Sequence, residues 1–557
     1  MNLTKFSWSN CIVAKFTCGQ LIVLLCGNKK HKGGEKMKRN KNALAVNIPA
    51  DGLFLAIEHN AGGDLSRENS VRIIKEYVDK YLDAKPDVVL LNVCYRRALT
   101  PSEVFDSFLY NIETDDDGFA VRGPDGKTKK TPNSTAGCVS KYFTTFFNCA
   151  SVLLKNGVDI YAVLTEYIRQ KGSRVFLSLR MNDGHHPDDP AINSSFALKD
   201  GSKHTILHDG VQLDYSQKAV RNYFYQYIKE LLENYTFDGI ELDWLRFPTL
   251  LPKEKRGDLE ILNGYMRSVR ALIDSYNKDI SLAVRVLPDP KEVLGNGTDV
   301  CIWIADGCVD MVTIENFYTP ANFEMPVAQW RKNIAEKNTA NHPYKLFCGT
   351  DWGVSCVYKY SIAMTPALVR GFASECISRG ADGVYLFNFF EENGTSSFEF
   401  VADGQKAYLK NCFAERIKAA RENESLPRRT VHMGLSNDRY PISLSPCESY
   451  EFSYTAKKPF GNCRLIVGSD AKGALSVSIN GILHDGAKQK VYDGFGYVPE
   501  NEIGTKGEFI YATTQAAPCV FAFAVSDGVV SSKEMRISIK NVSAETAKIL
   551  WIEIENI

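Results

Sequence analysis

Phe237-Asp-Gly-Ile-Glu-Leu-Asp-Trp-Leu-Arg-Phe-Pro248 is the stretch of sequence that decides the predicted fold. Alternation along a strand places Glu241 and Asp243 on one face, opposite the apolar Ile240. Because an ionised carboxylate is costly to bury unless it is paired and hydrogen-bonded, two acids on one central strand are not expected for stability alone. The stretch therefore predicts a strand whose acidic face has a function. A structural strand held by salt bridges is the alternative.

Strand-like and helix-like segments alternate along the chain on both sides of this stretch, a pattern typical of parallel sheets. Together with the acidic stretch, the predicted strands are Leu53–Asn60, Asp87–Arg96, Arg174–Asn182, Ile280–Leu287, Met311–Tyr318, Lys345–Trp352 and Gly383–Phe390. Helices are expected between them, including one over residues 66–84 that Ser66 caps and a last one over residues 403–422. Eight strands that are each followed by a helix predict an α/β fold, a (β/α)8 TIM barrel over residues 51–425.

The two ends of the chain have a different character. Residues 428–557 contain many short alternating runs separated by Gly and Asn/Asp turns, which predict an all-β sandwich, jelly-roll-like, as an accessory domain. Residues 1–50 are expected to be a peripheral segment that need not be ordered. An apolar run at residues 19–27 resembles a short secretory signal, and Met37 is a second plausible start. We expect a cytoplasmic protein if translation starts near Met37, and a secreted or cell-envelope protein otherwise.

Composition excludes some classes of partner. The 557 residues include 66 Lys and Arg and 66 Asp and Glu, so zero net charge gives no general reason to expect nucleic acid or an anionic membrane as partner. No stretch beyond the N-terminal run is long enough to span a bilayer. The 15 cysteines show no Cys-x-x-Cys pair, which argues against a zinc knuckle and a disulfide scaffold. The oligomeric state is left open.

Polar residues share one phase of the alternation near the ends of the predicted strands. They are Glu58, Arg96, Arg180, Asn182, Glu241, Asp243, Arg285, Glu315, Asp351 and Asn388. Inward residues at the carboxyl ends of barrel strands meet at one mouth, where barrel enzymes place their chemistry. A purely structural barrel would carry Val, Ile and Leu at such positions. We therefore expect these side chains to line one site.

Three carboxylates at the outer end of this set suggest a chemistry. Glycosidic bond cleavage uses one carboxyl group of raised pKa that protonates the leaving oxygen, and one ionised carboxylate that attacks carbon or activates water. We expect Asp243 to be the nucleophile or base and Glu315 the acid, with Asp351 as the substitute for either. Glu241 lies deeper on its strand and is expected to pair with an arginine.

Other side chains are candidates for binding the substrate. The aromatic candidates are Trp244, Tyr318 and Trp352, whose rings suit sugar faces; ordinary core packing is the alternative for each. The basic candidates are Arg96, Arg180, Arg246 and Arg285, which either bind the carboxylate or sulfate of an acidic sugar or neutralise the acids of the site itself.

The loop after the third predicted strand offers Asp183, His185 and His186. The two histidines invite a metal site, but adjacent residues on a loop rarely ligate one ion together, so a substrate-binding or structural role is favoured. We predict neither a metal nor another cofactor.

The acidic stretch resembles two groups of barrel glycosidases. Its Asp-Gly-x-x-x-Asp frame is similar to the fourth strand of family 18 chitinases, but the third acid of that pattern falls on Leu245 here. The stretch looks more like the bacterial glycosyl hydrolase-like barrels called family 10-like, whose strand reads roughly Asp-Gly-Ile-His-x-Asp-Tyr-x-Arg-Tyr-Pro. Asp238, Asp243 and Arg246 match that pattern, and Glu241 stands where a histidine is usual. The resemblance implies that Asp243 is a catalytic carboxylate.

These observations predict a glycoside hydrolase that acts on an oligo- or polysaccharide, with an acidic sugar as one option. A carbohydrate-binding barrel without turnover is the main alternative. A metal-dependent hydrolase that uses His185 and His186 is a further one.

Overall fold

The chain divides into two units, Met1–Asn40 and Lys41–Ile557, and every residue described here belongs to the second. The computed structural model describes residues 42–556 except the segments 134–140, 186–188, 199–204, 207–211, 318–322, 352, 358–359, 390–399, 403–404, 410–411, 422–425, 427, 433–440, 456–461, 471–474, 490–502, 505–518 and 526–532.

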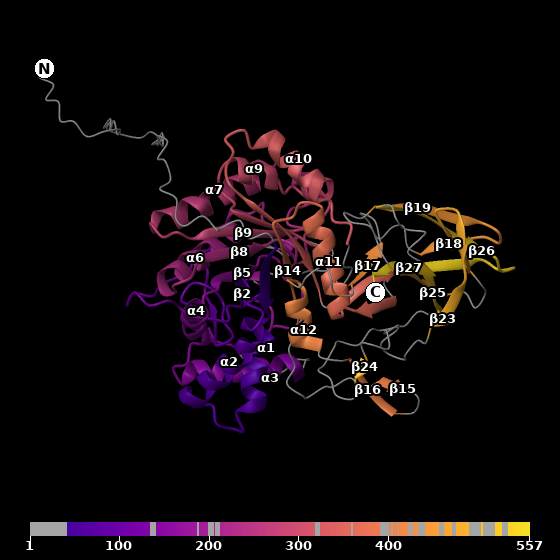
Figure 1. The fold of residues 1–557 in the computed structure, drawn as a ribbon. Helices are drawn as coiled ribbons and strands as arrows, with labels where there is room; N and C mark the ends of the chain where they lie inside the picture. Colours follow the sequence, from indigo (N-terminus) through magenta and orange to yellow (C-terminus); the bar gives the residue numbers. More distant parts are fainter. Residues whose placement is uncertain are drawn as a thin grey trace, which may run out of the picture. The chain divides into compact units, whose positions relative to one another are not determined.

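Eight parallel strands close into a barrel (Figure 1). Around the barrel, neighbours in order are β1 (Ala43–Ile48), β14 (Gly383–Leu386), β11 (Lys345–Thr350), β10 (Met311–Ile314), β9 (Ser281–Val286), β8 (Gly239–Asp243), β5 (Arg174–Arg180) and β2 (Val88–Cys94). The strands are short and almost entirely buried, and most of their residues are apolar, as expected for a parallel sheet covered on both faces. The prediction of a (β/α)8 barrel followed by a β-sandwich is confirmed.

The first strand was predicted in the wrong place. Residues Leu53–Asn60 belong to the helix α1 (Ala50–Asn60), whose buried face includes Leu53, Phe54 and Ile57. That spacing fits a helix as well as a buried strand, and Pro49 stands just before it as the N-cap residue. β1 lies instead within residues 1–50, which were predicted to be peripheral. Glu58 is consequently an exposed residue of a helix and does not lie at the end of a barrel strand.

Helices surround the barrel, as the alternation predicts (Figure 1). The longer ones are α2 (Arg67–Leu82), α3 (Lys141–Lys155), α4 (Ile160–Gln170), α6 (Lys218–Asn234), α7 (Glu260–Ser275), α10 (Val327–Lys337) and α11 (Pro366–Ser378). Ser66 caps α2 as predicted, since its side chain accepts a hydrogen bond from the backbone of Asn69. The helix predicted over residues 403–422 is shorter than expected: Cys412–Ala419 forms α12, whereas Gln405–Leu409 forms the strand β16, which pairs with β15 (Phe400–Ala402).

A polar insertion follows β2 and contains the hairpin of β3 (Tyr110–Ile112) and β4 (Lys130–Pro132). Side chains of α6 hold this insertion. Asn222 Nδ2 donates to Asp117 O at 2.9 Å, and Gln226 Nε2 donates to Gly118 O at 2.8 Å. The carboxylate of Glu230 accepts hydrogen bonds from Ser102 Oγ and from the backbone N–H of Glu103. The insertion is therefore anchored along a helix of the outer ring.

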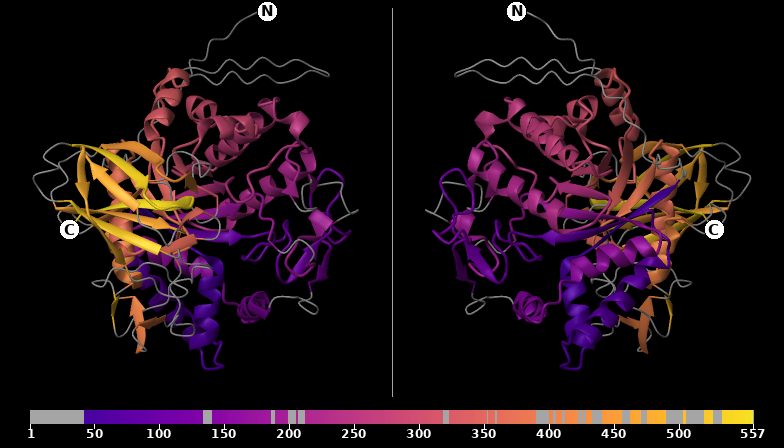
Figure 2. Two further views of the ribbon diagram at one scale, coloured as in Figure 1. Left: turned by 90° about the vertical axis from the view of Figure 1, so that its right-hand side faces the viewer. Right: turned by 90° about the vertical axis from the view of Figure 1, so that its left-hand side faces the viewer.

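The C-terminal residues form two antiparallel sheets (Figure 2). One contains β17 (Arg428–His432), β18 (Ile442–Leu444), β20 (Cys463–Ser469), β23 (Gly486–Gln489), β25 (Cys519–Val525) and β27 (Ala547–Asn556). The other contains β19 (Ser449–Thr455), β21 (Leu475–Ile479), β22 (Ile482–His484) and β26 (Glu534–Asn541).

The sandwich contacts the barrel through α11. The hydroxyl of Tyr454 donates to the Glu375 carboxylate, and Arg429 Nη1 lies 3.5 Å from Thr365 Oγ1. At Gly371 an added Cβ would lie 1.9 Å from the carbonyl oxygen of Arg429, so the helix and β17 approach closely enough to require glycine. The sandwich and the barrel are therefore in direct contact along α11.

Inward-facing residues change character along the barrel axis. Towards the amino ends of the strands the interior is filled by apolar side chains, which include Ala43, Ala45, Val88, Leu90, Phe176, Met311 and Phe347. The same cluster includes Ala283 and Tyr385, and it reaches Phe387 beyond the carboxyl end of β14. On the same phase of the alternation, two to four residues further along several strands, stand Ser178, Glu241, Thr313, Asp243 and Arg285. The carboxyl end of the barrel is therefore polar.

Among the described residues, no helix is both long and apolar enough to cross a membrane. The cysteines in the same part of the chain are free thiols, and most of them are buried.

Candidate active site

Asp243, Arg285 and Glu315 form a buried ion-pair cluster where β8, β9 and β10 end. Arg285 contacts both oxygens of Asp243, with Nε–Oδ1 at 3.1 Å and Nη2–Oδ2 at 2.9 Å. Its remaining nitrogen, Nη1, lies 2.9 Å from Glu315 Oε2. The three residues are 0%, 1% and 2% exposed. One guanidinium thus serves two carboxyl groups.

Glu315 is the carboxyl group of this cluster that most readily holds a proton. Burial raises its pKa to about 8, and the negative charges of Asp351 and Asp243 add to the rise against the opposing charge of Arg285. The chain makes room for this side chain at Gly349 in β11, where a Cβ would lie 2.2 Å from Glu315 Oε2 and 2.8 Å from Glu315 Cβ. A protonated carboxylic acid at a barrel mouth is suited to general acid catalysis.

Asp243 makes more contacts within the protein than a carboxylate that reacts with the substrate would need. Besides both contacts with Arg285, its Oδ1 accepts hydrogen bonds from the backbone N–H groups of Leu245 at 3.1 Å and Arg246 at 3.4 Å. Neither oxygen reaches solvent. Contact with a substrate would therefore require Arg285 to release it.

Glu241 lies one inward position deeper than Asp243. Its Oε1 accepts hydrogen bonds from Ser178 Oγ at 2.7 Å and from Tyr385 OH at 3.1 Å, whereas an arginine partner was expected. Burial raises its pKa to about 7, and the charge of Asp243 adds to the rise. Glu241 is 0% exposed, so it lies beneath the other carboxylates and is out of contact with solvent.

Asp351 follows β11 and is 6% exposed, which places it nearer to solvent than Asp243 or Glu315. Its negative charge acts on both Glu315 and Arg246. The three predicted catalytic carboxylates are therefore brought together at one end of the barrel.

Three arginines surround the ring of Phe387, which follows β14. The guanidinium carbons of Arg285, Arg246 and Arg180 lie 3.6, 5.3 and 5.9 Å from its centroid. Such contacts are favourable because the face of an aromatic ring is negative. Phe387 was missed in the sequence, although it continues the inward phase of residues 383 and 385.

His185 and Asp183 lie beside these arginines. Asp183 Oδ2 contacts Arg180 Nη1 at 2.9 Å, and Asp183 Oδ1 contacts His185 Nδ1 at 2.6 Å. His185 Nε2 is 3.5 Å from Arg246 Nη2, which gives this histidine a role in the polar network of the mouth. In the part of the chain that is described, no three His, Cys, Asp or Glu side chains are grouped to hold a metal ion.

Several residues that were predicted to bind the substrate contact other parts of the protein in the structure. Asn182 is 0% exposed, and its amide bonds the backbone of Phe247, Thr249 and Leu213, so it shapes a loop. Trp244 is 2% exposed and packs edge-on against Tyr215 at 5.1 Å, which makes it a core residue. Arg96 is 3% exposed, and its charge acts on Tyr215. The predictions for His186, Tyr318 and Trp352 lie outside the described residues.

Buried polar atoms without a hydrogen-bond partner among the described residues gather in this region. They include Arg180 Nε, Glu241 Oε2, Glu315 Oε1, Asn316 Nδ2 and Asn388 Oδ1. Asn388 also adopts a positive φ of 52° at the end of β14. Because buried polar atoms in native proteins are nearly always paired, such a concentration indicates a place for water or a polar ligand.

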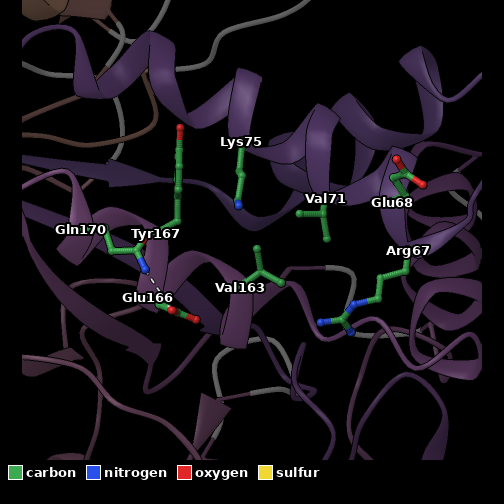
Figure 3. A pocket seen from close by; sticks show the side chains of 8 residues that line it. All are labelled: Arg67, Glu68, Val71, Lys75, Val163, Glu166, Tyr167 and Gln170. Carbon is green, nitrogen blue, oxygen red and sulfur yellow. Dashed lines mark hydrogen bonds between the residues drawn. The ribbon is translucent and has the colours of Figure 1, made fainter.

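A separate groove of about 580 Å³ lies on the outer ring, between α2 and α4 (Figure 3). Arg67, Lys75, Glu166 and Tyr167 are among the residues that line it. Its charges are of both signs, and Glu166 is already bonded to Gln170 at 2.9 Å. None of the mouth residues borders this groove, so it is not part of the candidate site.

No protein-family model matches the chain, and no curated protein matches its sequence. The resemblance to family 10-like and family 18 barrels accordingly stays a prediction. Several solved structures are similar to it, and they are glycoside hydrolases. The PgaB (BpsB) glycoside hydrolase domain from Bordetella bronchiseptica has 12% identity and a TM-score of 0.35 over 62% of this chain and 93% of its own.

Two others cover more of this chain. A GH27 β-L-arabinopyranosidase from Geobacillus stearothermophilus has 10% identity and a TM-score of 0.34 over 90% of this chain and 97% of its own. The catalytic domain of GH30 xylanase C from Talaromyces cellulolyticus has 11% identity and a TM-score of 0.34, with 90% and 96% covered. At these identities and TM-scores, the comparisons bear neither on the substrate nor on the residues of the site.

Proposed function

We propose that this chain is a glycoside hydrolase that cleaves an O-glycosidic bond in an oligo- or polysaccharide, with Glu315 as the acid. The observation that carries the proposal is the setting of Glu315: a carboxyl group with a pKa of about 8, between two other acids, at the carboxyl end of a closed parallel barrel. Asn316 Nδ2 and Asn388 Oδ1, which have no hydrogen-bond partner in the part of the chain that is described, supply a donor and an acceptor suited to sugar hydroxyl groups.

Two carboxylates compete for the second role, that of nucleophile or base. Asp243 is the residue that the sequence resemblance favours, but both of its oxygens contact Arg285 and it is fully buried. Asp351 is more exposed and acts electrostatically on Glu315. We assign the second catalytic role to Asp351, and we assign to Asp243 the positioning of Arg285.

The assignment of Glu315 as the acid is tested with substrates whose leaving groups differ in their need for a proton. A screen of mixed glycans, read by released reducing ends, first identifies a sugar that is cleaved. For that sugar, Glu315→Gln should slow hydrolysis of an alkyl glycoside by roughly 10²–10⁴-fold. It should leave a dinitrophenyl glycoside far less affected, because that leaving group departs without a proton. Equal losses on both substrates would remove Glu315 from the role of acid.

The same substrates test the pH dependence. A general acid must be protonated, so kcat/KM for the alkyl glycoside should fall as the pH rises through about 8, the pKa of Glu315. The fall should be absent in Glu315→Gln. If kcat/KM of Glu315→Gln still fell with rising pH as it does in the wild type, the fall would belong to another titrating group.

The two candidates for the second role are separated by removing each carboxylate. Asp351→Ala should abolish turnover, and azide should restore it by occupying the vacated position as a nucleophile. Asp243→Asn should lower activity without azide rescue, because Asp243 does not contact substrate. Rescue of an Asp243→Ala variant instead would return the role to Asp243.

A carbohydrate-binding barrel without turnover is the second candidate function. The full engagement of Asp243 by Arg285 favours it, since the acid of the central strand is then structural. Tight glycan binding with no reducing ends released by the wild-type chain would support this candidate. A metal-dependent hydrolase is tested separately, because chelation would then remove the activity.

A further inference from the structure

Four inward side chains form a hydrogen-bonded chain inside the barrel, beneath the mouth. Asn92 Nδ2 of β2 donates to Ser178 Oγ of β5 at 3.4 Å, and Ser178 Oγ donates to Glu241 Oε1 of β8 at 2.7 Å. Tyr385 OH of β14 donates to the same oxygen of Glu241 at 3.1 Å. All four residues are 0% exposed. The chain therefore crosses the interior from β2 to β14.

Asn47 lies on β1, between the two strands at which this chain ends. It follows Ala45 in the inward phase of β1, a strand that was not predicted from the sequence. On one side Asn47 is paired with Leu90 of β2, and Asn92 is the next inward residue of that strand. On the other side Ala45 is paired with Tyr385 of β14. Asn47 is thus a neighbour of both ends of the chain.

The side chain of Asn47 is 0% exposed, and neither its Nδ2 nor its Oδ1 has a hydrogen-bond partner among the described residues. The same holds for Asn92 Oδ1 and Glu241 Oε2. Leaving a buried amide without hydrogen bonds is costly, and native proteins satisfy such groups with ordered internal water. These atoms offer the two to four polar contacts that such a water molecule typically makes.

The hydrogen bonds of Glu241 indicate which of its oxygens would carry a proton. Its Oε1 accepts from two hydroxyl groups, which uses both lone pairs of a carbonyl oxygen. In the neutral acid the proton is therefore on Oε2, where it needs an acceptor. The amide oxygens of Asn47 and Asn92 are such acceptors.

The charges around Glu241 favour its neutral form. Burial and the negative charge of Asp243 raise its pKa to about 7 against the charge of Arg285. All three nitrogens of Arg285 contact Asp243 or Glu315. Burial also raises the pKa of Tyr385, which stays a neutral phenol. The remaining strands present in this part of the interior the non-titrating residues Asn47, Asn92, Ser178, Thr313 and Gly349.

We propose that the barrel binds a water molecule between Asn47, Asn92 and Glu241, and that Glu241 is a neutral positioning residue that donates its proton to this water. The water donates in turn to Asn47 Oδ1 and Asn92 Oδ1. A neutral Glu241 leaves the charge of Arg285 to the two acids above it, Asp243 and Glu315. The inference goes beyond the proposed function, because it concerns the support beneath the mouth whether or not the barrel cleaves its ligand.

A crystal structure of the wild-type protein at high resolution tests the water. We expect an ordered water molecule within about 2.7–3.2 Å of Asn47, Asn92 and Glu241 Oε2. Asn47→Leu, which keeps a similar volume without polar atoms, should lose it. Asn92→Leu removes the other acceptor and serves if Asn47→Leu does not fold. A wild-type structure in which Asn47 bonds only to protein groups, with no water beside Glu241, overturns the proposal.

Infrared difference spectroscopy tests the proton, because a neutral carboxylic acid has a carbonyl band that a carboxylate lacks. Near pH 6, about one unit below the pKa of Glu241, Glu241→Gln should lose one such band of the wild type. Glu315→Gln should lose a different one, which assigns both. If Glu241→Gln loses no band, Glu241 is ionised and the proposal is overturned.

A matched pair of variants identifies the acceptor. In Asn47→Leu the Glu241 band should move to higher frequency, because its O–H group loses a hydrogen bond. Thr313→Val removes another buried polar atom that has no partner among the described residues, on β10, and should leave the band in place. A shift in Thr313→Val but not in Asn47→Leu would overturn the role of Asn47. Circular dichroism and thermal melting establish that each variant is folded.

Neither measurement needs a substrate, so this inference and the proposed function fail separately. If the water and the Glu241 band are found but no glycoside is cleaved, the hydrolase is overturned and the inference stands. If glycosides are cleaved by a protein that shows neither, the inference is overturned and the hydrolase stands.

Discussion

Two buried arginines, Arg285 in the barrel and Arg429 in the sandwich, hold carboxylates in different ways. Arg429 is 1% exposed and contacts both oxygens of Glu553, with Nε–Oε1 at 2.7 Å and Nη2–Oε2 at 3.2 Å. Its third nitrogen meets a hydroxyl group, that of Thr365. Arg285 makes the same two-oxygen contact with Asp243, but its third nitrogen meets a second carboxyl group, Glu315.

The difference shows what separates a structural pair from a reactive cluster. In the sandwich, Arg429 contacts both oxygens of the Glu553 carboxylate, so each of these oxygens is hydrogen-bonded. In the barrel, one cation is shared by two acids: Arg285 contacts both oxygens of Asp243 but Oε2 alone of Glu315, whose pKa is about 8. Sharing the cation leaves one acid able to keep its proton, which is the property that acid catalysis needs.

Removing each arginine should give the largest effects on stability. Arg285→Met and Arg429→Met each leave a buried carboxylate without its cation, which costs roughly 3–5 kcal/mol of unfolding free energy. We expect Arg285→Met to be the more damaging, because Asp243 and Glu315 both lose their partner. Urea denaturation followed by fluorescence measures the difference.

The sandwich pair also provides its own control. The double change Arg429→Met and Glu553→Met replaces the ion pair by apolar side chains and should recover most of the stability that Arg429→Met loses. If Arg429→Met proved more damaging than Arg285→Met, the two acids of the barrel mouth would not depend on a shared cation.

Strand periodicity explains which parts of the site could be predicted from sequence. Glu241, Asp243 and Arg285 lie within strands, where every second side chain points inward, so their convergence followed from alternation alone. The prediction for Glu58 was wrong because the apolar residues of Leu53–Asn60 have a spacing that fits a helix as well as a buried strand.

Two further binding candidates, Trp244 and Asn182, lie just beyond the strand ends and make contacts that the alternation did not predict. Trp244 follows the last residue of β8, and Asn182 lies two residues past β5. There the direction of a side chain depends on the turn, as the positive φ of 58° at Phe247 illustrates, and alternation no longer applies. The role of Phe387 also depends on three arginines from different strands, which sequence order does not bring together.

A smaller effect on stability is expected when a methyl group is added at one glycine in each region: Gly371, which faces Arg429 of the sandwich, and Gly349, which faces Glu315 of the barrel mouth. Gly371→Ala places Cβ against the backbone oxygen of Arg429, which cannot move without shifting β17, so we expect a loss of about 1–3 kcal/mol. Gly349→Ala places Cβ 2.2 Å from Glu315 Oε2 and 2.8 Å from Glu315 Cβ, so the carboxyl group must leave its position and the backbone beside it must shift. We expect that variant to lose activity as well as stability, whereas the clash of Gly371→Ala lies away from the candidate site. Thermal melts and turnover assays on both proteins test this, and unchanged turnover in Gly349→Ala would contradict the role of Glu315.

The last effect expected is a dependence of stability on pH that comes from Glu315. Its pKa is raised from 4.5 to about 8, so the folded protein binds more protons than the unfolded chain between these values. Stability should therefore fall as the pH rises from about 4.5 to about 8, by at most about 1.4 kcal/mol per pH unit. Glu315→Gln carries no titrating group there, so its stability should exceed that of the wild type increasingly towards pH 8. Glu241→Gln should show the same gain, ending near pH 7. Urea titrations at successive pH values give the differences, and curves that stay parallel to the wild type would mean that neither acid is protonated in the folded protein at neutral pH.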